Sequence, residues 1–457
     1  ILCLSLREGY PERVFLPIPQ KNYQKYRMSR ENLHFLTLFL IISVSVSSCD
    51  IADKARYDNY RLYRLHLETE EQVKMLQELE KMSDSYIFIG HARHPDQDLT
   101  IIVAAHKIAE AADLFKRYNI TAQVLVFNIQ EKIEKEWDNV LPEKTPGYQL
   151  DWQHYFHLET INQWLDLQLS NHKDLTSVSL GNSFEGRNIR GVKLSRKAGN
   201  TAVFVEGGIH AREWISPATS TYILNQLLTS SDPRVKELSE NFDWFFFPVV
   251  NPDGYVYTFE NDRLWRKNRK PYGPICRGVD LNRNFNSSWN GPGSSSDPCT
   301  YDFAGGSVNS EPEVAAIAQF IKTHAKESRI KTFLSLHSYS QLLMFPFGST
   351  TEQVPNYSDL KEIGQKAIDA LAKKHGTKFK TGSIIETIYP SSGGSSDWAY
   401  EEVGIKISYT FELRGPPDST DMFILPANQI TPVGEETLEA FIVIMNEAKA
   451  RGYYNDA

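Results

Sequence analysis

The chain has 457 residues, of which 41% are hydrophobic and 23% are charged, and its formal net charge is -8 at pH 7. This composition is ordinary for a globular protein, and the length predicts two or three domains. Nucleic-acid-binding proteins are more often basic, with clustered Lys and Arg, and the sequence contains no such cluster, internal repeat or low-complexity tract. We therefore expect no nucleic-acid partner.

The amino end carries the pattern of a secretory leader. From Met28, the first methionine, a basic start is followed by an apolar stretch at 33–42 and by small residues up to Cys49. This is the layout of a signal peptide, and the apolar part is shorter than the ~20 residues that cross a bilayer. We expect a signal peptide at 28–49, upstream translation outside the natural protein at 1–27, and a secreted, extracellular product. A membrane anchor is the alternative.

Residues 56–136 alternate between strand and helix patterns. Residues 60–65 alternate as a strand with one buried face does, and residues 70–82 place apolar side chains at helical spacing. Three such strand and helix pairs predict a small α+β domain, which we bound at residues 50–137.

A linker is expected at residues 138–147. Within it, residues 141–147 contain two prolines, a glycine and charged side chains, which mark an irregular connection. Lys144 is the expected cleavage point for a trypsin-like protease, and Lys132 and Lys135 are the alternatives.

Residues 148–457 continue the alternation of strands and helices over a longer stretch. Strand patterns occur at residues 201–206, 243–250, 331–336 and 404–412. Strands that alternate with helices predict an α/β domain with a parallel or mixed sheet. In such sheets, ligand sites lie beyond the carboxyl ends of the strands, so the residues at these ends are candidates for function.

Two of the four cysteines are expected to pair. Cys3 lies in the upstream segment and Cys49 at the predicted cleavage point. Cys276 and Cys299 then remain, around a loop rich in Gly, Ser and Asn. An even pair in a secreted chain predicts a disulfide formed in an oxidising compartment. Two free buried thiols are the alternative.

Candidate metal ligands follow two of the predicted strands. His210 and Glu213 come after the strand at 201–206 and its glycine turn, where they can direct an imidazole and a carboxylate to one point. His337 follows the strand at 331–336 in the matching position, and two His with one Glu form a common catalytic zinc set. The alternatives are a surface turn for the first pair and a hydrogen-bonded structural histidine for His337.

Glu412 ends the strand at 404–412 on its polar side. A carboxylate that lies near zinc without binding it can deprotonate the zinc-bound water, whose pKa the metal lowers toward ~7. The alternative for Glu412 is an exposed strand-end carboxylate paired with Arg414.

Six sequence motifs, taken in order, resemble those of the zinc carboxypeptidases of the pancreatic A/B type. They are His-Ala-Arg-Glu-Trp at 210–214, Leu-Trp-Arg-Lys at 264–267, Asp-Leu-Asn-Arg-Asn at 280–284, His-Ser-Tyr at 337–339, Ile-Tyr at 388–389 and Phe-Glu-Leu-Arg at 411–414. The similarity covers nearly all of 148–457, and residues 56–136 resemble the activation peptide of the family. The chain is thus identified as a preproenzyme of this family. The resemblance implies an α/β catalytic domain with a mixed central sheet and helices on both faces, preceded by a small α+β prodomain with an antiparallel sheet.

The resemblance implies metal and catalytic roles for matching residues. His210, Glu213 and His337 would bind one Zn2+ per chain, and Asp280 would orient a zinc-bound histidine. Glu412 would act as the general base and would then donate the proton to the leaving amine.

The resemblance also implies substrate contacts. Arg266 would polarise the scissile carbonyl and stabilise the oxyanion. Arg283 would bind the terminal carboxylate in a bidentate pair, so internal peptide bonds would be rejected because they leave this buried cation unpaired. The substrate-binding set is Arg212, Asn282, Arg283, Tyr339, Tyr389 and Ser396. Cys276 and Cys299 match the disulfide positions of the family.

Ser396 occupies the position that sorts substrates within the family. An acidic residue there would favour terminal Lys or Arg and an aliphatic residue would favour aromatic or aliphatic ends, so serine leaves the rule undecided. The other pocket positions lean apolar by resemblance, and they are Met344, Gly348, Ile384 and Thr410. A cationic side chain would be poorly solvated in a pocket without a counter-charge. We therefore expect A-type specificity, with B-type, broad or small-polar specificity as the alternative.

We expect a secreted, monomeric zymogen of a zinc-dependent exopeptidase that acts on the C-termini of peptides and proteins once a trypsin-like protease has cut it. By analogy, it would act in the gut lumen. One alternative is a non-catalytic relative that binds peptides, which would have lost a ligand or the base. Another is a membrane-held or intracellular carboxypeptidase of a different branch, against which the prodomain and the short leader argue.

Overall fold

The computed structural model describes residues 54–82, 85–90, 92–140, 150–327, 329–417 and 419–455, which belong to one compact unit. The upstream segment, the predicted signal peptide and most of the linker with Lys144 lie outside the described residues. Within the described ranges, no helix has both the length and the apolar character needed to span a bilayer.

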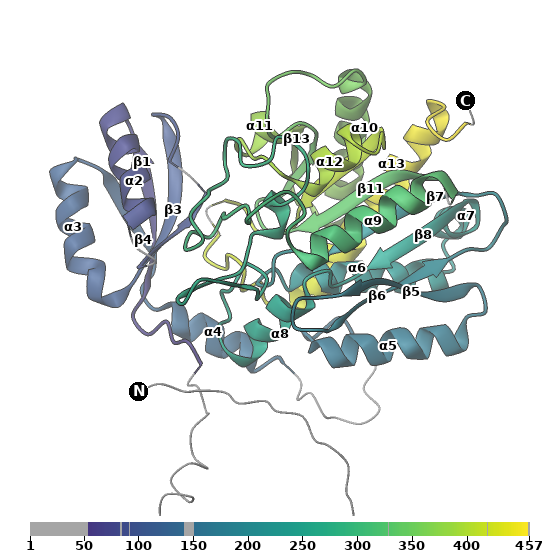
Figure 1. Ribbon diagram of the computed structural model, residues 1–457, viewed down its shortest axis with the longest axis horizontal. Coiled ribbons are helices and arrows are strands. Elements are labelled where there is room, and N and C mark those ends of the chain that lie inside the picture. Colours follow the sequence, from purple (N-terminus) through teal and green to yellow (C-terminus); the bar gives the residue numbers. More distant parts are fainter. Residues whose placement is uncertain are drawn as a thin grey trace, which may run out of the picture. The chain divides into compact units, whose positions relative to one another are not determined.

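The amino-terminal part of the described chain is a small α+β domain (Figure 1). Its antiparallel sheet has the strand order β2-β3-β1-β4. The strands are β1 (Arg61–Leu67), β2 (Tyr86–Ile89), β3 (Gln97–Val103) and β4 (Thr121–Val126). The helices are α2 (Glu70–Met82), the 3-10 turn η1 (Ala105–Lys107), α3 (Ile108–Arg117) and α4 (Ile129–Trp137).

Both faces of this small sheet are covered, as β1 illustrates. Tyr63, Leu65 and Leu67 pack in one cluster with α2 and α3, whereas Leu62 points to the other face and packs in a cluster with α4. The predicted small α+β domain is confirmed. Strand β2 was not predicted, because four consecutive apolar residues lack the period that separates a strand from a helix.

The larger domain is built on an eight-stranded mixed sheet of order β13-β12-β14-β11-β7-β8-β6-β5. Its strands are β5 (Leu175–Asn182), β6 (Asn188–Leu194), β7 (Thr201–Gly207), β8 (Phe242–Phe247), β11 (Ile330–His337), β12 (Leu342–Phe345), β13 (Lys380–Ser383) and β14 (Ile407–Glu412). The central run β14-β11-β7-β8 is parallel, whereas β5, β6 and β12 join through antiparallel pairs. A separate hairpin consists of β9 (Pro271–Tyr272) and β10 (Cys276–Arg277).

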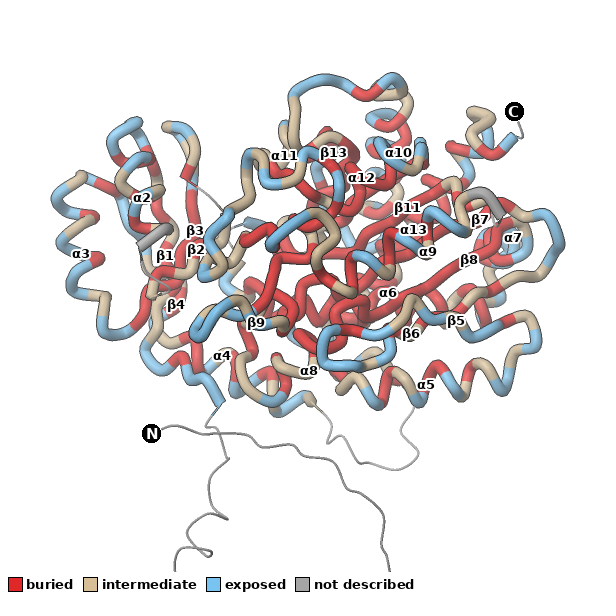
Figure 2. Tube along the Cα trace, viewed as in Figure 1, coloured by how far each residue is buried: buried red, intermediate tan, exposed pale blue. Residues whose placement is uncertain are grey.

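Helices cover both faces of the large sheet. They are α5 (Leu158–Asn171), α6 (Ile215–Thr229), α7 (Pro233–Asn241), α8 (Pro252–Glu260), α9 (Pro312–Glu327), α10 (Tyr357–His375), α11 (Ile384–Thr387), α12 (Ser395–Glu401) and α13 (Ile430–Ala450), with 3-10 turns η2 (Leu281–Arg283) and η3 (Ala427–Gln429). In β7, Val203 and Val205 pack in one core cluster with α6, α10 and α13, whereas Ala202 and Phe204 pack in another with α9 and α12. Figure 2 shows the central strands buried along their length. The predicted mixed central sheet with helices on both faces is confirmed.

The strand expected at 404–412 begins later than its sequence pattern suggests. Gly404 adopts a φ of 83°, and the backbone N–H of Ile405 donates to the carbonyl of Ala399. These residues close a turn after α12, so pairing with the sheet starts only at Ile407.

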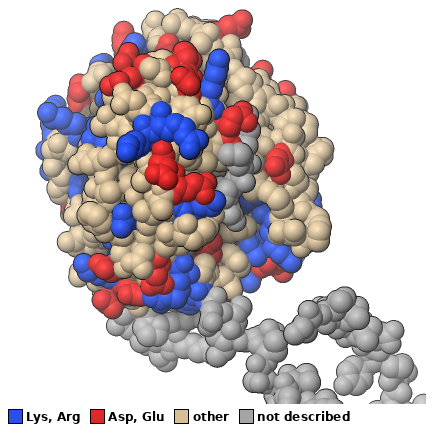
Figure 3. Space-filling model, turned by 90° about the vertical axis from the view of Figure 1, so that its left-hand side faces the viewer, with Lys and Arg blue, Asp and Glu red and all other residues tan. Residues whose placement is uncertain are grey.

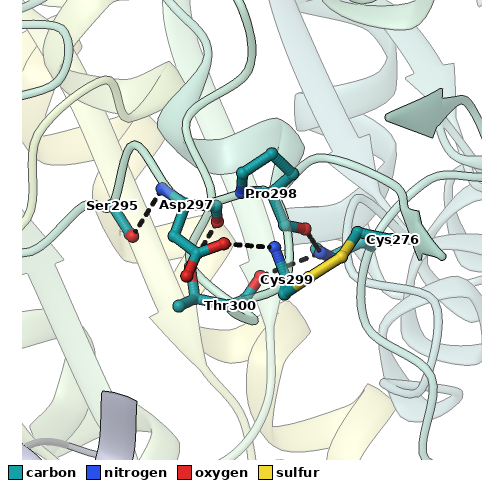
Figure 4. Close-up of a disulfide and its surroundings, with 7 residues drawn as sticks. Cys276, Ser295, Asp297, Pro298, Cys299 and Thr300 are labelled. Atoms are coloured by element: carbon teal, nitrogen blue, oxygen red, sulfur yellow. Dashed lines mark hydrogen bonds between the residues drawn. A yellow bond between two sulfur atoms is a disulfide. The ribbon is translucent and has the colours of Figure 1, made fainter. Parts of the chain in front are cut away.

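Cys276 and Cys299 form a disulfide that closes the loop after β10 (Figure 4). Their Cα atoms are 5.0 Å apart and they are separated by 23 positions in the sequence. The backbone N–H of Cys299 donates to Oδ1 of Asp297 at 2.9 Å, and the N–H of Asp297 donates to Oγ of Ser295 at 3.0 Å. The loop is therefore held both covalently and by local hydrogen bonds.

The exposed surface of the small domain carries charges of both signs. On the face shown in Figure 3, acidic and basic side chains are interspersed. Arg64 pairs with Asp98, and Nζ of Lys107 lies 2.6 Å from Oε2 of Glu110. Exposed pairs of this kind contribute little to stability, and their main effect is to balance the surface charge.

We expect Phe204→Ala to lower the free energy of unfolding by about 3–5 kcal/mol, the usual cost of removing a buried phenylalanine ring. Phe204 is fully buried, and its ring centroid lies 5.2 Å from that of Phe247 and 5.6 Å from that of Phe333. Urea unfolding measures the effect. The control Ile275→Ala, at a side chain that is 86% exposed, should change stability by no more than about 0.5 kcal/mol. Equal effects of the two substitutions would contradict this account of the core.

Candidate active site

Three side chains that could hold a metal ion meet where β7 and β11 end. His210 and Glu213 lie in the turn between β7 and α6, and His337 is the last residue of β11, the parallel neighbour of β7. The turn depends on its glycines. A Cβ on Gly207 would lie 2.7 Å from a backbone carbonyl oxygen after β8, and Gly208 adopts a φ of 63°, which favours glycine.

The nitrogen and oxygen atoms of these three side chains face one another. Nδ1 of His210 lies 2.8 Å from Oε1 of Glu213 and 3.1 Å from Nδ1 of His337. The same atom of His337 lies 3.4 Å from Oε2 of Glu213. All three residues are buried, and their ligand atoms lie within 4.8 Å of one another, so a single ion can contact all of them.

The contact of Nε2 with Asp280 determines which ring nitrogen of His210 carries the proton. Nε2 lies 3.1 Å from Oδ1 of Asp280, and a carboxylate only accepts hydrogen bonds, so Nε2 is the protonated nitrogen. Burial and then the charge of Arg266 lower the pKa of His210, so the ring is neutral and Nδ1 carries a lone pair. A lone pair that faces a carboxylate oxygen of Glu213 is repelled unless a cation lies between them. The donor set therefore fits a zinc ion.

Asp280 is shared between His210 and Arg266. Its Oδ2 accepts hydrogen bonds from Nε and Nη2 of Arg266 at 3.0 and 2.8 Å, and Nη1 of this guanidinium lies 3.8 Å from Oε1 of Glu213. Burial opposes the charge of Arg266, but Asp280 outweighs it and raises the pKa of the guanidinium. A permanent cation therefore lies beside the candidate metal site.

Arg283 and Asn282 lie in η2 and are fixed by hydrogen bonds to the backbone. Nε of Arg283 donates to the carbonyl of Gly293 at 2.8 Å, and Nη1 donates to the carbonyl of Asn282 at 2.9 Å. Oδ1 of Asn282 accepts the N–H of Ser395 at 2.8 Å, and the ring of Tyr389 lies 5.9 Å from Cζ of Arg283. This wall offers a cation, an amide and a phenol to an anionic ligand.

Glu412 is the last residue of β14 and pairs in register with His337 across the parallel strands. Its side chain is partly exposed to the cavity, and the loss of bulk water there raises its pKa to about 8. The alternative of a pair with Arg414 is wrong, because that guanidinium donates to Glu436 at 3.1 Å and also to Gln429. Glu412 is thus a carboxyl group next to the metal set and not part of it.

A single cavity joins most of these residues. Its volume is about 430 Å3, and ligand pockets usually measure ~300–1,000 Å3. The predicted residues that line it are His210, Arg212, Glu213, Arg266, Asn282, Arg283, Tyr339, Tyr389, Ser396 and Glu412. His337 and Asp280 are buried outside this lining and contact it through His210.

Two hydroxyl groups and two apolar side chains also line the cavity. Oγ of Ser396 lies 2.6 Å from Oγ1 of Thr410, and Met344 and Ile384 contribute the apolar surface. The neighbouring Asp397 accepts a backbone N–H at 2.8 Å, and burial raises the pKa of its carboxyl group to about 7. This part of the cavity therefore combines uncharged side chains with one carboxyl group of raised pKa.

The small domain supplies the opposite wall of the same cavity. Its lining residues are Phe88, Ile89, Gly90, Arg93, Gln97, Asp98 and Leu99. The guanidinium carbon of Arg93 lies 4.5 Å from the ring centroid of Tyr389. The site described here is thus covered while the small domain is in place.

Helix α4 anchors this cover on the larger domain. Nη2 of Arg263 donates to Oε1 of Glu136 at 2.9 Å, and both residues are buried. Nζ of Lys132 donates to Oδ1 of Asp421 at 2.8 Å. An apolar cluster shared by the two domains contains Leu62, Ile102, Val126, Ile129, Ile133, Leu264, Tyr339, Met422, Phe423 and Ile424. Apolar burial and a buried ion pair therefore both hold the small domain on the larger domain.

Sequence reasoning missed several cavity residues, of which Arg93 and Phe423 are two. Arg93 lines the cavity from the small domain, and Phe423 lies with its ring centroid 3.9 Å from Cζ of Arg212 and 5.1 Å from the ring of Tyr339. Burial lowers the pKa of Arg212 to about 10. No local motif marks Arg93 or Phe423, because their roles depend on contacts between distant parts of the chain.

Two family models match the chain. The carboxypeptidase activation peptide model matches residues 63–136, and the zinc carboxypeptidase model matches residues 161–440. Zinc carboxypeptidase A 1 of Anopheles gambiae is 44% identical over 417 residues, which cover 91% of this chain and 95% of the relative. Carboxypeptidase B of Astacus astacus is 42% identical over 304 residues, which cover 66% of this chain and 99% of the relative.

A solved structure agrees with these matches. The crystal structure of carboxypeptidase A from Helicoverpa armigera aligns with a TM-score of 0.78 at 29% sequence identity, covering 86% of this chain and 98% of that chain. The similarity therefore includes both the small domain and the larger one. The chain belongs to the zinc carboxypeptidase family, as a proenzyme of the A/B type.

Proposed function

We propose that this enzyme removes single residues from the C-termini of peptides and proteins, with a preference for aromatic or aliphatic ends. The observation that carries the proposal is that the cation of Arg283 lines the same cavity as His210, Glu213 and Glu412. A free terminal carboxylate can pair with this cation. An internal peptide bond would leave it buried and unpaired, which is costly.

His210, Glu213 and His337 would hold one zinc ion. When bound, the ion lowers the pKa of a coordinated water and polarises a carbonyl oxygen. Glu412 would accept a proton from the attacking water and would then deliver it to the leaving amine.

Two arginines would pair with the negative charges of the substrate. Arg266 stays protonated beside Asp280, so it can stabilise the oxyanion that develops on the scissile carbonyl. Arg283 can bind both oxygens of the terminal carboxylate. The remaining substrate contacts are assigned to Arg212, Asn282, Tyr339, Tyr389 and Ser396.

The uncharged side chains in one part of the cavity support the A-type preference. Ser396 and Thr410 contribute uncharged hydroxyls, and Met344 and Ile384 contribute apolar surface. Asp397 accepts the backbone N–H of Gly348, so one of its carboxyl oxygens is already used. A terminal Lys or Arg would therefore lose hydration without gaining a full ion pair.

Activation is proposed to occur by cleavage within 138–147, between an activation peptide at 50–137 and a catalytic domain at 148–457. Lys132 and Lys135 lie inside α4, and Lys132 is paired with Asp421, so a cut at either lysine would require the helix to unwind. Lys144 in the predicted linker is therefore the proposed site for a trypsin-like protease.

The protein is proposed to act outside the cell as a single chain. The disulfide between Cys276 and Cys299 supports an oxidising compartment, in agreement with the signal-peptide pattern at 28–49. A monomer is proposed as the active unit. The gut lumen remains an expectation by analogy.

Glu412→Gln is expected to keep about one zinc per chain and to lower kcat by about 10²–10⁴-fold, because an amide cannot accept the proton. Elemental analysis and turnover of a peptide by the protease-activated protein measure the two quantities. The control Glu352→Gln, at an exposed carboxylate, should leave both unchanged. Near-normal turnover of Glu412→Gln would remove this residue from the role of base.

The intact chain is expected to hydrolyse peptides slowly and to gain activity after treatment with trypsin, because the small domain lines the cavity. Lys144→Gln should block this gain, whereas the controls Lys132→Gln and Lys135→Gln should not. Peptide hydrolysis before and after trypsin, together with the sequence of the new amino terminus, measures the effect. Full activity of the uncut chain would refute the zymogen.

The activated wild-type enzyme is expected to release terminal Phe and Leu faster than Lys and Arg, and Ser396→Asp should reverse that order by adding a counter-charge. Mass spectrometry of a digested peptide library measures the released residues. Ser396→Ala is the matched control, because it removes the hydroxyl without adding charge and should keep the wild-type order. Preferential release of Lys or Arg by the wild type would contradict the proposed specificity.

A further inference from the structure

A buried carboxylate that the proposed mechanism does not use lies behind His337. Glu206 is in β7 and is fully buried. Its Oε2 accepts hydrogen bonds from Oγ of Ser335 at 2.6 Å and from Oγ of Ser395 at 2.8 Å. Its Oε1 is buried without a hydrogen-bond partner among the described residues.

Glu206 occupies an unfavourable environment. None of the ion pairs found among the described residues includes it, and a buried carboxylate without a cationic partner opposes folding. Its neighbours in β7 are apolar and fully buried, including Phe204 and Val205. An apolar side chain would suit this position better, so the carboxylate points to a function.

Ser335 links this carboxylate to the metal set. A serine hydroxyl has a single proton and can also accept hydrogen bonds. Ser335 gives its proton to Glu206, and its Oγ also lies 2.9 Å from Nε2 of His337. With that proton already used, the hydroxyl can only accept from His337, so Nε2 of this ring carries the hydrogen.

The tautomer of His337 follows from this chain of hydrogen bonds. An imidazole that binds a metal is neutral, with one protonated nitrogen and one lone pair for the metal. With the proton on Nε2, the lone pair is on Nδ1, the atom that faces His210 and Glu213. Metal-bound histidines commonly donate their other N–H to a fixed acceptor, which sets the tautomer and the ring orientation.

We propose that Glu206 is a positioning residue that sets the tautomer of His337 through Ser335 and so keeps Nδ1 available to the metal. The inference rests on the proposed role of His337 as a zinc ligand. The tautomer of His210 is set without an intervening hydroxyl, because its Nε2 contacts Asp280 directly. In both histidines a carboxylate fixes the proton on Nε2, and for His337 it acts through the hydroxyl of Ser335.

Removal of Glu206 would reverse the direction of the hydrogen bond between Ser335 and His337. Without Glu206, the proton of Ser335 is free to turn toward Nε2 of His337, which would then accept it. The ring proton would move to Nδ1 and point at His210 and Glu213, where it blocks metal binding. A glutamine at position 206 would still accept the proton of Ser335 through its amide oxygen, so it should preserve the tautomer although it removes the charge.

The test is the zinc affinity of the full proenzyme, measured by competition with a chromogenic chelator. Glu206→Leu and Ser335→Ala are expected to weaken zinc binding by about 10–100-fold, the usual effect of losing the partner behind a metal ligand, whereas Glu206→Gln stays within about threefold of the wild type. The matched control is Glu313→Gln in α9. Glu313 is also fully buried and hydrogen-bonded, but to Phe184 and Asn268, so its substitution should leave zinc affinity unchanged.

Wild-type affinity of Glu206→Leu would overturn the proposal. So would equal losses in Glu206→Gln and Glu206→Leu, because they would show that the charge acts and not the hydrogen bond. If Glu206→Leu does not fold, Ser335→Ala decides alone, and unchanged affinity in that variant overturns the proposal. A wild-type protein that binds no zinc would instead refute the ligand assignment, so the two failures are distinguishable.

Discussion

Two imidazoles and a carboxylate held with their lone pairs face to face impose the constraint around which this protein is arranged. When both rings are neutral, the lone pairs of His210 and His337 and the carboxylate of Glu213 repel one another unless a cation lies between them. Hydrogen bonds to Asp280 and Ser335 prevent the rings from rotating away. A cation removes the repulsion, so metal binding and the local fold stabilise each other.

The parallel strands β7, β11 and β14 make this convergence possible. They are neighbours in the sheet, so their carboxyl ends share one edge and bring together His210 and His337, which are 127 positions apart in the sequence. Arg266 and Arg283 come from irregular segments that no strand constrains. Hydrogen bonds to Asp280 and to backbone carbonyls fix these guanidiniums instead. The sheet thus positions the metal set, and buried polar contacts position the cations.

Sequence patterns predicted the domains and the residues at the strand ends, because long apolar runs followed by short polar motifs carry local information. They failed where the neighbours of a residue decide its role. The strand expected at 243–250 stops at Phe247, since Pro248 has no N–H to continue the pairing. Glu206 stands inside an apolar run, and nothing nearby in the sequence connects it with Ser335 or His337. Arg93 likewise lines the cavity only because one domain packs against the other.

The contacts that hold the small domain have a consequence for the order of events in activation. The buried pair of Glu136 with Arg263 and the shared apolar cluster around Phe423 do not involve the predicted linker at 138–147. A protease that cuts this linker removes the covalent tether and leaves these contacts intact. After a cut in this predicted linker, hydrolysis and dissociation would therefore be separate steps, and the severed peptide would stay bound as a non-covalent inhibitor until it dissociates.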